Sequence, residues 1–116
     1  MKRGTDGALL VLAALSGAIA VAAGAFAAHG ASGRAAEWLR TGGSYQLIHA
    51  AAALAVLARP RGRSVAWLFI AGSGLFAATL YAMAFGAPRW LGAITPLGGL
   101  AMIAGWLWLA AGGLRR

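Results

Sequence analysis

The sequence predicts an all-α integral membrane protein, a four-helix bundle with a short interfacial helix between its first two helices. Of the 116 residues, 61% are hydrophobic and only 10% are charged. Long apolar runs alternate with short segments that contain glycine, proline and arginine. A soluble domain of this size could not bury so much apolar surface, so the lipid bilayer is the expected surrounding of the chain.

The first apolar run, residues 7–28, contains no charged side chain. As a helix it would be about 33 Å long, enough to cross a hydrocarbon core of about 30 Å. A cleaved signal peptide is the alternative, because Lys2 and Arg3 precede the run and Ala25-Phe26-Ala27 resembles a cleavage site. The run is longer than the usual signal core and further apolar runs follow, so we expect a retained helix.

Residues 34–41 have one apolar side, with Trp38 and Leu39 beside Arg34, Glu37 and Arg40. Eight residues are too few to span a bilayer, so this segment is expected to lie at the headgroup level as a short interfacial helix. The second spanning helix is expected over residues 43–58. Three arginines and a proline at residues 59–63 end it, because they favour neither lipid nor a continuing helix.

Two further apolar runs predict spanning helices over residues 65–86 and 91–113, with a turn around Pro88 between them. Glycine and alanine recur at helical intervals along the predicted spans, which is typical of close helix packing in membranes. The predicted packing positions are Gly17, Gly24, Gly74, Ala78, Gly98 and Gly105.

The ten basic residues give a net charge of +8, and they lie in the tails and turns. No basic helical face accompanies them, so nucleic acid is not an expected partner, whereas anionic lipid headgroups are. Most Lys and Arg residues fall on the side of the two termini, which predicts that both termini are cytoplasmic. The tryptophans agree with this topology: Trp67, Trp106 and Trp108 are expected at the inner interface, and Trp38 and Trp90 at the outer one.

This topology brings six polar side chains from different helices to a similar depth in the outer leaflet. Two interpretations stay open: a polar pocket for a metal ion, water, a quinone or a lipid headgroup, or an internal hydrogen-bond network that fixes helix packing. Two histidines without cysteine or a nearby carboxylate fall short of a usual metal site, so no metal or cofactor is predicted. The predicted cluster consists of His29, Tyr45, Gln46, His49, Tyr81 and Thr95.

Few residues suit catalysis. Asp6 and Glu37 are the only carboxylates, and cysteine is absent. We therefore expect a non-enzymatic protein that acts by helix packing, as an accessory or assembly subunit of a larger membrane complex or as a homo-oligomer. The alternative is the binding or transport of a small molecule, lipid, quinone or ion through the predicted cluster. A membrane enzyme or redox protein with a borrowed metal or haem is a third hypothesis.

Four sequence blocks make the chain resemble the DUF423 family of small four-helix membrane proteins, which includes YgdD-like bacterial inner-membrane proteins and eukaryotic transmembrane protein 256. The resemblance implies an integral inner-membrane protein with four helices, and it implies no particular activity. The blocks are Gly24-Ala25-Phe26-x-Ala28-His29, Thr41-x-x-x-Tyr45-Gln46-x-x-His49, Gly74-x-Phe76 to Tyr81, and Gly92-x-Ile94-Thr95-Pro96-Leu97-Gly98-Gly99 followed by Gly105-Trp106.

The chain departs from the family pattern at two places. Ala27 stands where the family typically has a second glycine, and Ala77-Ala78-Thr79 stands where Ser-Gly-Ser usually precedes the tyrosine. Both changes keep the side chains small, so the expectation of close packing is unchanged.

Overall fold

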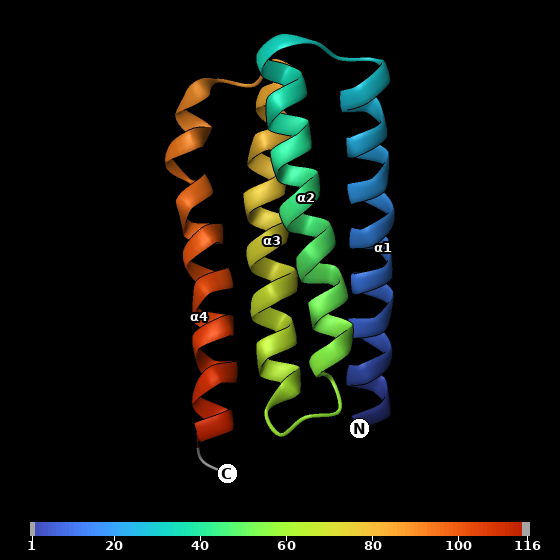
Figure 1. Ribbon diagram of the computed structural model, residues 1–116, viewed down its shortest axis with the longest axis vertical. Coiled ribbons are helices and arrows are strands. Elements are labelled where there is room, and N and C mark those ends of the chain that lie inside the picture. The colour runs from blue at the N-terminus through green and yellow to red at the C-terminus, as the bar shows by residue number, and fades with distance from the viewer. Residues whose placement is uncertain (1, 115–116) are drawn as a thin grey trace.

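The computed structural model describes residues 2–114, and four long helices account for most of them (Figure 1). No strand occurs within these residues, which confirms the predicted all-α helical bundle. A short 3-10 helix, η1, precedes the last long helix. The elements are α1 (Lys2–His29), α2 (Gly33–Val56), α3 (Gly62–Ala84), η1 (Arg89–Ala93) and α4 (Thr95–Leu114).

Successive helices run in opposite directions, so the chain passes up and down along its long axis (Figure 1). The α1–α2 and α3–α4 connections lie at one end of the molecule. The α2–α3 loop and the ends of α1 and α4 nearest the termini lie at the other. The molecule measures 46 × 24 × 20 Å. Its long axis is therefore close to the thickness of a bilayer with its headgroups, about 40–45 Å.

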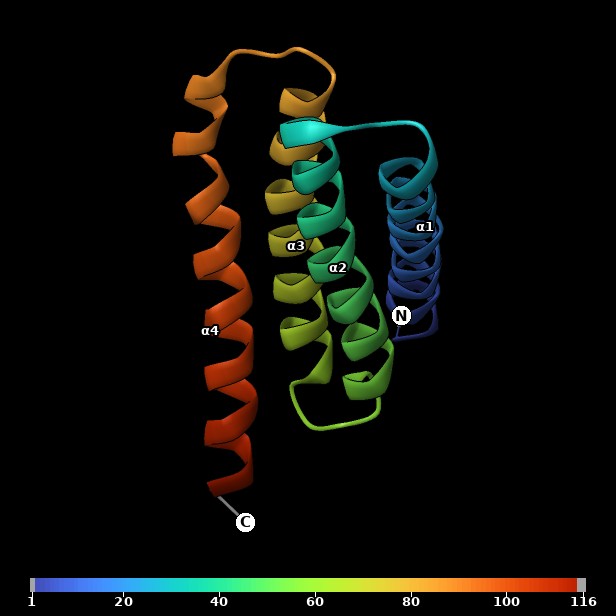
Figure 2. The same cartoon turned by 45° about the horizontal axis from the view of Figure 1, so that its top comes forward.

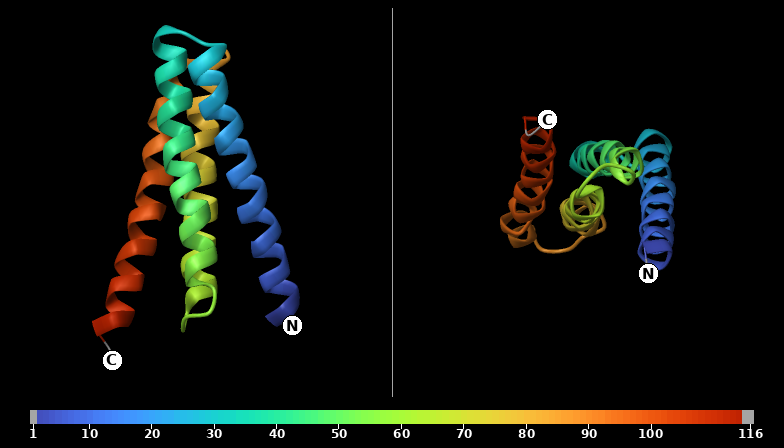
Figure 3. Two further views of the ribbon diagram at one scale, coloured as in Figure 1. Left: turned by 45° about the vertical axis from the view of Figure 1, so that its right-hand side comes forward. Right: turned by 90° about the horizontal axis from the view of Figure 1, so that it is seen from below.

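The helices do not form a closed square. α2 packs against both α1 and α3, and α4 packs mainly against α3. Figure 2 shows α1 and α4 on opposite sides of the α2–α3 pair, and Figure 3 shows both diverging from that pair towards the end that holds the α2–α3 loop. A large part of α4 is consequently open to the surroundings, and its only buried residues are Thr95, Gly98, Met102 and Gly105.

The separate interfacial helix predicted over residues 34–41 does not form. These residues are the beginning of α2, which continues without a break to Val56. The glycines at 42 and 43 do not interrupt it, because both pack against neighbouring helices. A Cβ on Gly42 would lie 2.8 Å from Cε1 of Tyr81 in α3, and one on Gly43 would lie 3.1 Å from the carbonyl oxygen of Ala20 in α1. The glycines therefore serve close packing and do not end the helix.

Among the residues that the structure describes, three helical segments are long and apolar enough to cross a membrane: Asp6–His29, Gly62–Ala84 and Arg89–Leu114. Four spans were expected from the sequence. α2 has 24 residues, which is sufficient length, but it carries Arg34, Glu37 and Arg40 near its start and the polar Gln46 and His49 further along. The last two are buried against other helices, each only 5% exposed, so α2 presents less polarity to its surroundings than its sequence indicates.

Helix contacts involve some of the predicted small residues and leave others outside. A Cβ on Gly98 would lie 2.5 Å from the carbonyl oxygen of Gly72, and one on Gly105 would lie 2.7 Å from Cε1 of Phe69, so both glycines lie where α4 meets α3. By contrast, a Cβ on Gly17, Gly24 or Gly74 would meet nothing within 4 Å, and Ala78 is exposed, although the backbone nitrogen of Gly24 borders the contact with Gly43 of α2.

The physical reason is the rotation of each helix. α3 meets α4 through the face that contains Phe69 and Gly72, whereas Gly74 lies on a different face. On α1, the side chains of Ala13, Ala20 and Ala27 are buried at seven-residue spacing, and the intervening glycines are not. A repeat of small residues thus identifies a helix that packs closely, but it does not say which face does so.

Candidate functional site

The polar cluster predicted from the sequence is divided by the structure into separate hydrogen-bonded contacts. His49 binds to Trp106 of α4, Gln46 binds to Tyr81 of α3, and Thr95 at the start of α4 binds to Thr79 of α3. His29 belongs to none of them: it is exposed at the end of α1 and makes no hydrogen bond to any side chain that the structure describes. Five of the six predicted residues are therefore brought to the helix contacts, in three groups.

His49 uses both of its ring nitrogens. The indole Nε1 of Trp106 donates to His49 Nε2 at 2.9 Å, and His49 Nδ1 lies 2.7 Å from the backbone oxygen of Tyr45. An indole N–H can only donate, so Nε2 must accept, and the proton of a neutral ring is then on Nδ1, which donates to Tyr45. This network assigns His49 to the neutral Nδ1–H tautomer. Metal binding through either nitrogen would require the loss of one of these bonds.

The ring of His49 lies among aromatic side chains. The ring centroid of Phe69 is 5.3 Å away and that of Trp106 is 5.8 Å away, and both contacts are edge-on. Tyr45 stacks one turn away at 6.3 Å, and it also contacts Phe76 at 4.9 Å. His49 is thus positioned by three helices, whereas the side chain of Tyr45 is 46% exposed.

A second polar contact joins α2 to α3. The hydroxyl of Tyr81 donates to Oε1 of Gln46 at 2.6 Å. Gln46 is 5% exposed, so its amide is almost completely removed from the surroundings. Because an unpaired amide is costly in an apolar environment, this bond favours the observed rotation of α2 against α3.

A third polar contact joins α3 to the beginning of α4. The hydroxyl oxygens of Thr79 and Thr95 lie 2.6 Å apart, and either can be the donor. Each hydroxyl also lies near a backbone oxygen of its own chain segment, Thr79 near Phe76 at 2.9 Å and Thr95 near Leu91 at 3.3 Å. Both side chains are buried, so this contact connects the two helices beside the Gly72–Gly98 contact.

A groove between α2 and α4 lies next to His49. Its volume is about 310 Å³, and Phe76 of α3 also lines it. Its walls are mostly apolar, with Tyr45, His49 and Trp106 as the polar exceptions. The residues that line the groove are Tyr45, His49, Phe76, Gly99, Met102, Ile103 and Trp106.

Within the described residues, no three histidine or acidic side chains gather closely enough to hold a metal ion. The sequence does not indicate the polar contacts that involve α4. Trp106, which the sequence places at the inner interface, donates to His49. Thr79, which the sequence marks only as a small residue, is the partner of Thr95. The residues of each pair belong to different helices, and no spacing along one helix could have identified their partners.

Three described helical segments of membrane length and an apolar interior in which Gln46 and His49 pair across helices define an integral membrane protein of the helical class. Residues 23–99 match the family described as "Protein of unknown function (DUF423)", and the chain belongs to this family. The resemblance seen in the sequence blocks is thereby confirmed.

Relatives align over nearly the whole chain. A UPF0382 membrane protein of Haemophilus influenzae is 44% identical, over 91% of this chain and 93% of its own length. The UPF0382 inner membrane protein YgdD of Escherichia coli K12 is 38% identical, over 92% of this chain and 89% of its own. A UPF0382 membrane protein of Staphylococcus saprophyticus is 37% identical, over 89% and 93%. No solved structure matches the chain. The names of these relatives and the three apolar helices agree with a bacterial inner membrane protein.

Proposed function

We propose that this protein is a non-enzymatic membrane component that acts by helix packing, as an accessory or assembly subunit of a larger membrane complex or as a homo-oligomer. The observation that carries the proposal is that one side of α4 is not covered by the other helices. This helix packs mainly against α3, and it exposes Leu100, Ile103 and Leu107 at helical spacing, with exposed fractions of 62%, 54% and 65%. A second membrane helix would extend the packing on this side.

The use of the polar side chains supports the same function. Both nitrogens of His49 are occupied, and Gln46 pairs with Tyr81. The two carboxylates of the chain, Asp6 and Glu37, lie in α1 and at the start of α2, away from these groups. These buried polar groups are thus used to join helices, which is the role that the proposal gives them.

The test is gentle solubilisation from the native membrane, followed by size separation and mass spectrometry. A stoichiometric partner or a defined oligomer is expected with the wild-type protein. It is expected to be lost when Leu100, Ile103 and Leu107 are all replaced by alanine. The matched control replaces Leu12, Leu15 and Ile19, which have the same spacing and are exposed on α1. A wild-type monomer without partner, or equal loss in both variants, would contradict the proposal.

The second candidate function is the binding or transport of a small molecule, lipid, quinone or ion. The groove of about 310 Å³ beside Tyr45, His49 and Trp106 favours it. The expected result is a molecule that co-purifies with the wild-type protein and is lost from a Tyr45→Ala variant, because Tyr45 lines the groove without a described side-chain hydrogen bond. Retention of the same molecule in Tyr45→Ala and in a groove-filling Gly99→Leu variant would exclude this function.

The topology proposal follows the distribution of Lys and Arg: both termini are cytoplasmic in a bacterial inner membrane. The chain has no cysteine, so single cysteines introduced at Gly30 and at Gly113 give two clean labelling positions. A membrane-impermeant thiol reagent added to intact inner-membrane spheroplasts is expected to label the first and spare the second. The reverse pattern would overturn this orientation.

A further inference from the structure

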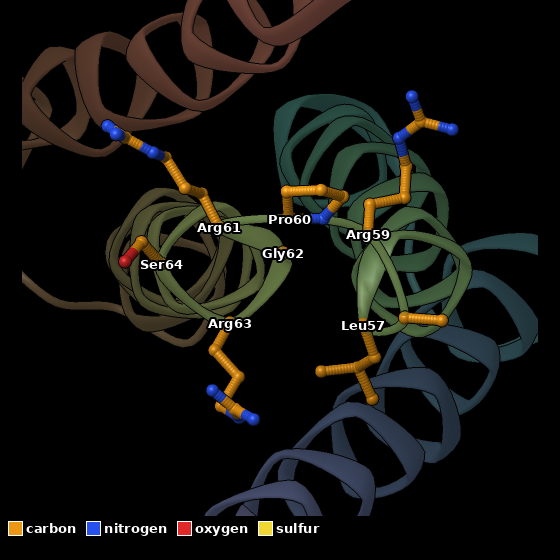
Figure 4. A pocket seen from close by; sticks show the side chains of 8 residues that line it. Leu57, Arg59, Pro60, Arg61, Gly62, Arg63 and Ser64 are labelled. Carbon is orange, nitrogen blue, oxygen red and sulfur yellow. The ribbon is translucent and has the colours of Figure 1, made fainter.

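The loop between α2 and α3 surrounds a cavity of about 400 Å³ at the end of the molecule (Figure 4). Residues 59–63, which comprise the end of this loop and the first two residues of α3, are called the arginine loop below because Arg59, Arg61 and Arg63 occupy every second position. We propose that the arginine loop binds the phosphate group of an anionic phospholipid, held by Arg59 and Arg61. The site is independent of the packing function proposed above.

This end of the molecule carries positive charge that its carboxylate side chains do not balance. Of Arg59, Arg61 and Arg63, it is Arg63 that has a carboxylate partner among the described residues: its Nε donates to Oδ1 of Asp6 at 2.9 Å. The other carboxylate side chain, Glu37, lies near the start of α2, at the opposite end of the molecule. No carboxylate side chain in the sequence therefore remains for Arg59 and Arg61, and both arginines are exposed.

The directions of the arginines separate their roles. Figure 4 shows Arg59 and Arg61 leaving the same side of the loop with Pro60 between them; Arg61 points towards α4, and the two guanidinium groups diverge. Arg59 lines a hollow with Leu109 and Gly112 of α4, whereas Arg63 leaves on the opposite side, towards α1. Arg63 thus fastens α3 to α1 through Asp6. Arg59 and Arg61 form the pair that faces outward beside α4, and guanidinium groups suit the oxygens of a phosphate.

The backbone of the arginine loop is fixed by short hydrogen bonds. The backbone nitrogen of Arg59 donates to the oxygen of Val56 at 3.0 Å, and that of Gly62 donates to the oxygen of Arg59 at 2.8 Å. A Cβ at residue 62 would overlap the carbonyl of Val56, so only glycine fits there. The two arginine side chains consequently project from a defined turn.

Apolar surface adjoins the arginines, which favours a lipid over a soluble phosphate. A small hollow between the arginine loop and α4 is lined by Arg59, Pro60, Leu109 and Gly112. In a phospholipid a glycerol ester links the phosphate to the acyl chains, so a charged group lies close to apolar ones, and here Arg59 likewise lies close to Leu109. A soluble phosphate would gain nothing from the apolar part of this surface.

The depth of the site agrees with the headgroup region. Trp67 at the beginning of α3 is 40% exposed, and Trp108 near the end of α4 is 39% exposed. Exposed tryptophans are typical of membrane interfaces. The arginine loop lies beyond Trp67 towards the end of the molecule. Its arginines are therefore at the level where lipid phosphates lie, and their long side chains can reach them.

The test is native mass spectrometry of the purified full-length protein in detergent, titrated with phosphatidylglycerol or with phosphatidylcholine of the same chains. The wild-type protein is expected to prefer phosphatidylglycerol. Replacing Arg59→Gln together with Arg61→Gln is expected to weaken that binding about ten-fold or more, because each basic residue near a membrane surface contributes to the attraction of anionic lipid. The single variants Arg59→Gln and Arg61→Gln provide the same test if the double variant does not fold.

The matched control replaces Arg40→Gln together with Arg89→Gln, which removes the same charge at the other end of the molecule. This variant is expected to bind phosphatidylglycerol within about two-fold of the wild-type protein. An equal loss in both double variants would show that only net charge matters, and would overturn the site. If an equal concentration of inorganic phosphate displaced the lipid, the site would bind phosphate and not a lipid. A wild-type protein without preference for phosphatidylglycerol would also contradict the proposal.

Discussion

The indole Nε1 of Trp106 donates a hydrogen bond to Nε2 of His49 at 2.9 Å, across residues that are 57 positions apart in the chain. This contact joins α2 to α4, which otherwise meet mainly through α3. It also fixes the tautomer of His49, because the indole group has no lone pair to offer. A tryptophan that the sequence assigned to the membrane interface thus has a specific partner inside the protein.

Replacing Trp106→Phe is expected to lower the free energy of unfolding by about 1 kcal/mol, because Nε2 of His49 would lose its donor in an apolar setting. Thermal unfolding of the purified protein in detergent, followed by circular dichroism, measures the change. Trp108→Phe is the control, since Trp108 is on the same helix and makes no described side-chain hydrogen bond. Equal shifts in the two variants would show that the hydrogen bond contributes nothing.

Replacing Gly98→Ala is expected to destabilise the protein by about 1–3 kcal/mol, because the new Cβ would press on the backbone of Gly72 and Phe76 in α3. The adjacent residue provides the control: a Cβ on Gly99 would meet nothing within 4 Å. Gly99→Ala is therefore expected to leave the unfolding temperature unchanged or slightly raised. Similar unfolding temperatures for the two variants would contradict the close α3–α4 contact.

Replacing Ser73→Ala is expected to stabilise the protein by about 1 kcal/mol. The hydroxyl of Ser73 is completely buried and has no hydrogen-bond partner within the described part of the chain. Burial of an unpaired hydroxyl is costly, and alanine removes the group with almost no change in volume. Ser44→Ala, at an exposed position, is expected to have no measurable effect. A destabilised Ser73→Ala variant would reveal a partner for the hydroxyl.

The bond between Tyr81 and Gln46 is tested by a double-mutant cycle. Tyr81→Phe and Gln46→Leu are each expected to destabilise the protein, and the pair together by less than the sum. The coupling expected for a single bond between membrane helices is about 0.6 kcal/mol, and at most about 1.7. Tyr45→Phe serves as the control, because the side chain of Tyr45 is half-exposed and makes no described hydrogen bond. Additive effects of the two changes would exclude the bond.

The course of three helices was predictable, because a long uncharged run in a bilayer has little alternative to a helix. The beginning of α2 was not. Arg34, Glu37 and Arg40 followed by two glycines indicate a short surface helix and a break, yet α2 runs through them. Gly42 and Gly43 stay helical at the place where α3 and α1 pack closely against α2. Contacts between helices of this kind cannot be predicted from the local sequence.

The candidate site shows the same limit. The sequence indicates that buried polar residues in lipid must find partners, and His49, Gln46 and Thr95 do. Which partner each finds depends on the rotation and crossing of whole helices. The predicted cluster therefore separates into three contacts, His29 stays outside, and Trp106 and Thr79 enter as unexpected members.

The buried residues of α4 end at Gly105, although the helix continues to Leu114. Its first half packs against α3 through glycine contacts and a threonine pair, whereas few residues of the chain pack against its second half. The stability of this half therefore depends on its solvent: lipid or a neighbouring subunit supplies the contacts that the protein does not. The local stability of α4 consequently depends on what surrounds it. When detergent replaces the native surroundings, we expect the C-terminal turns of this helix to lose stability first.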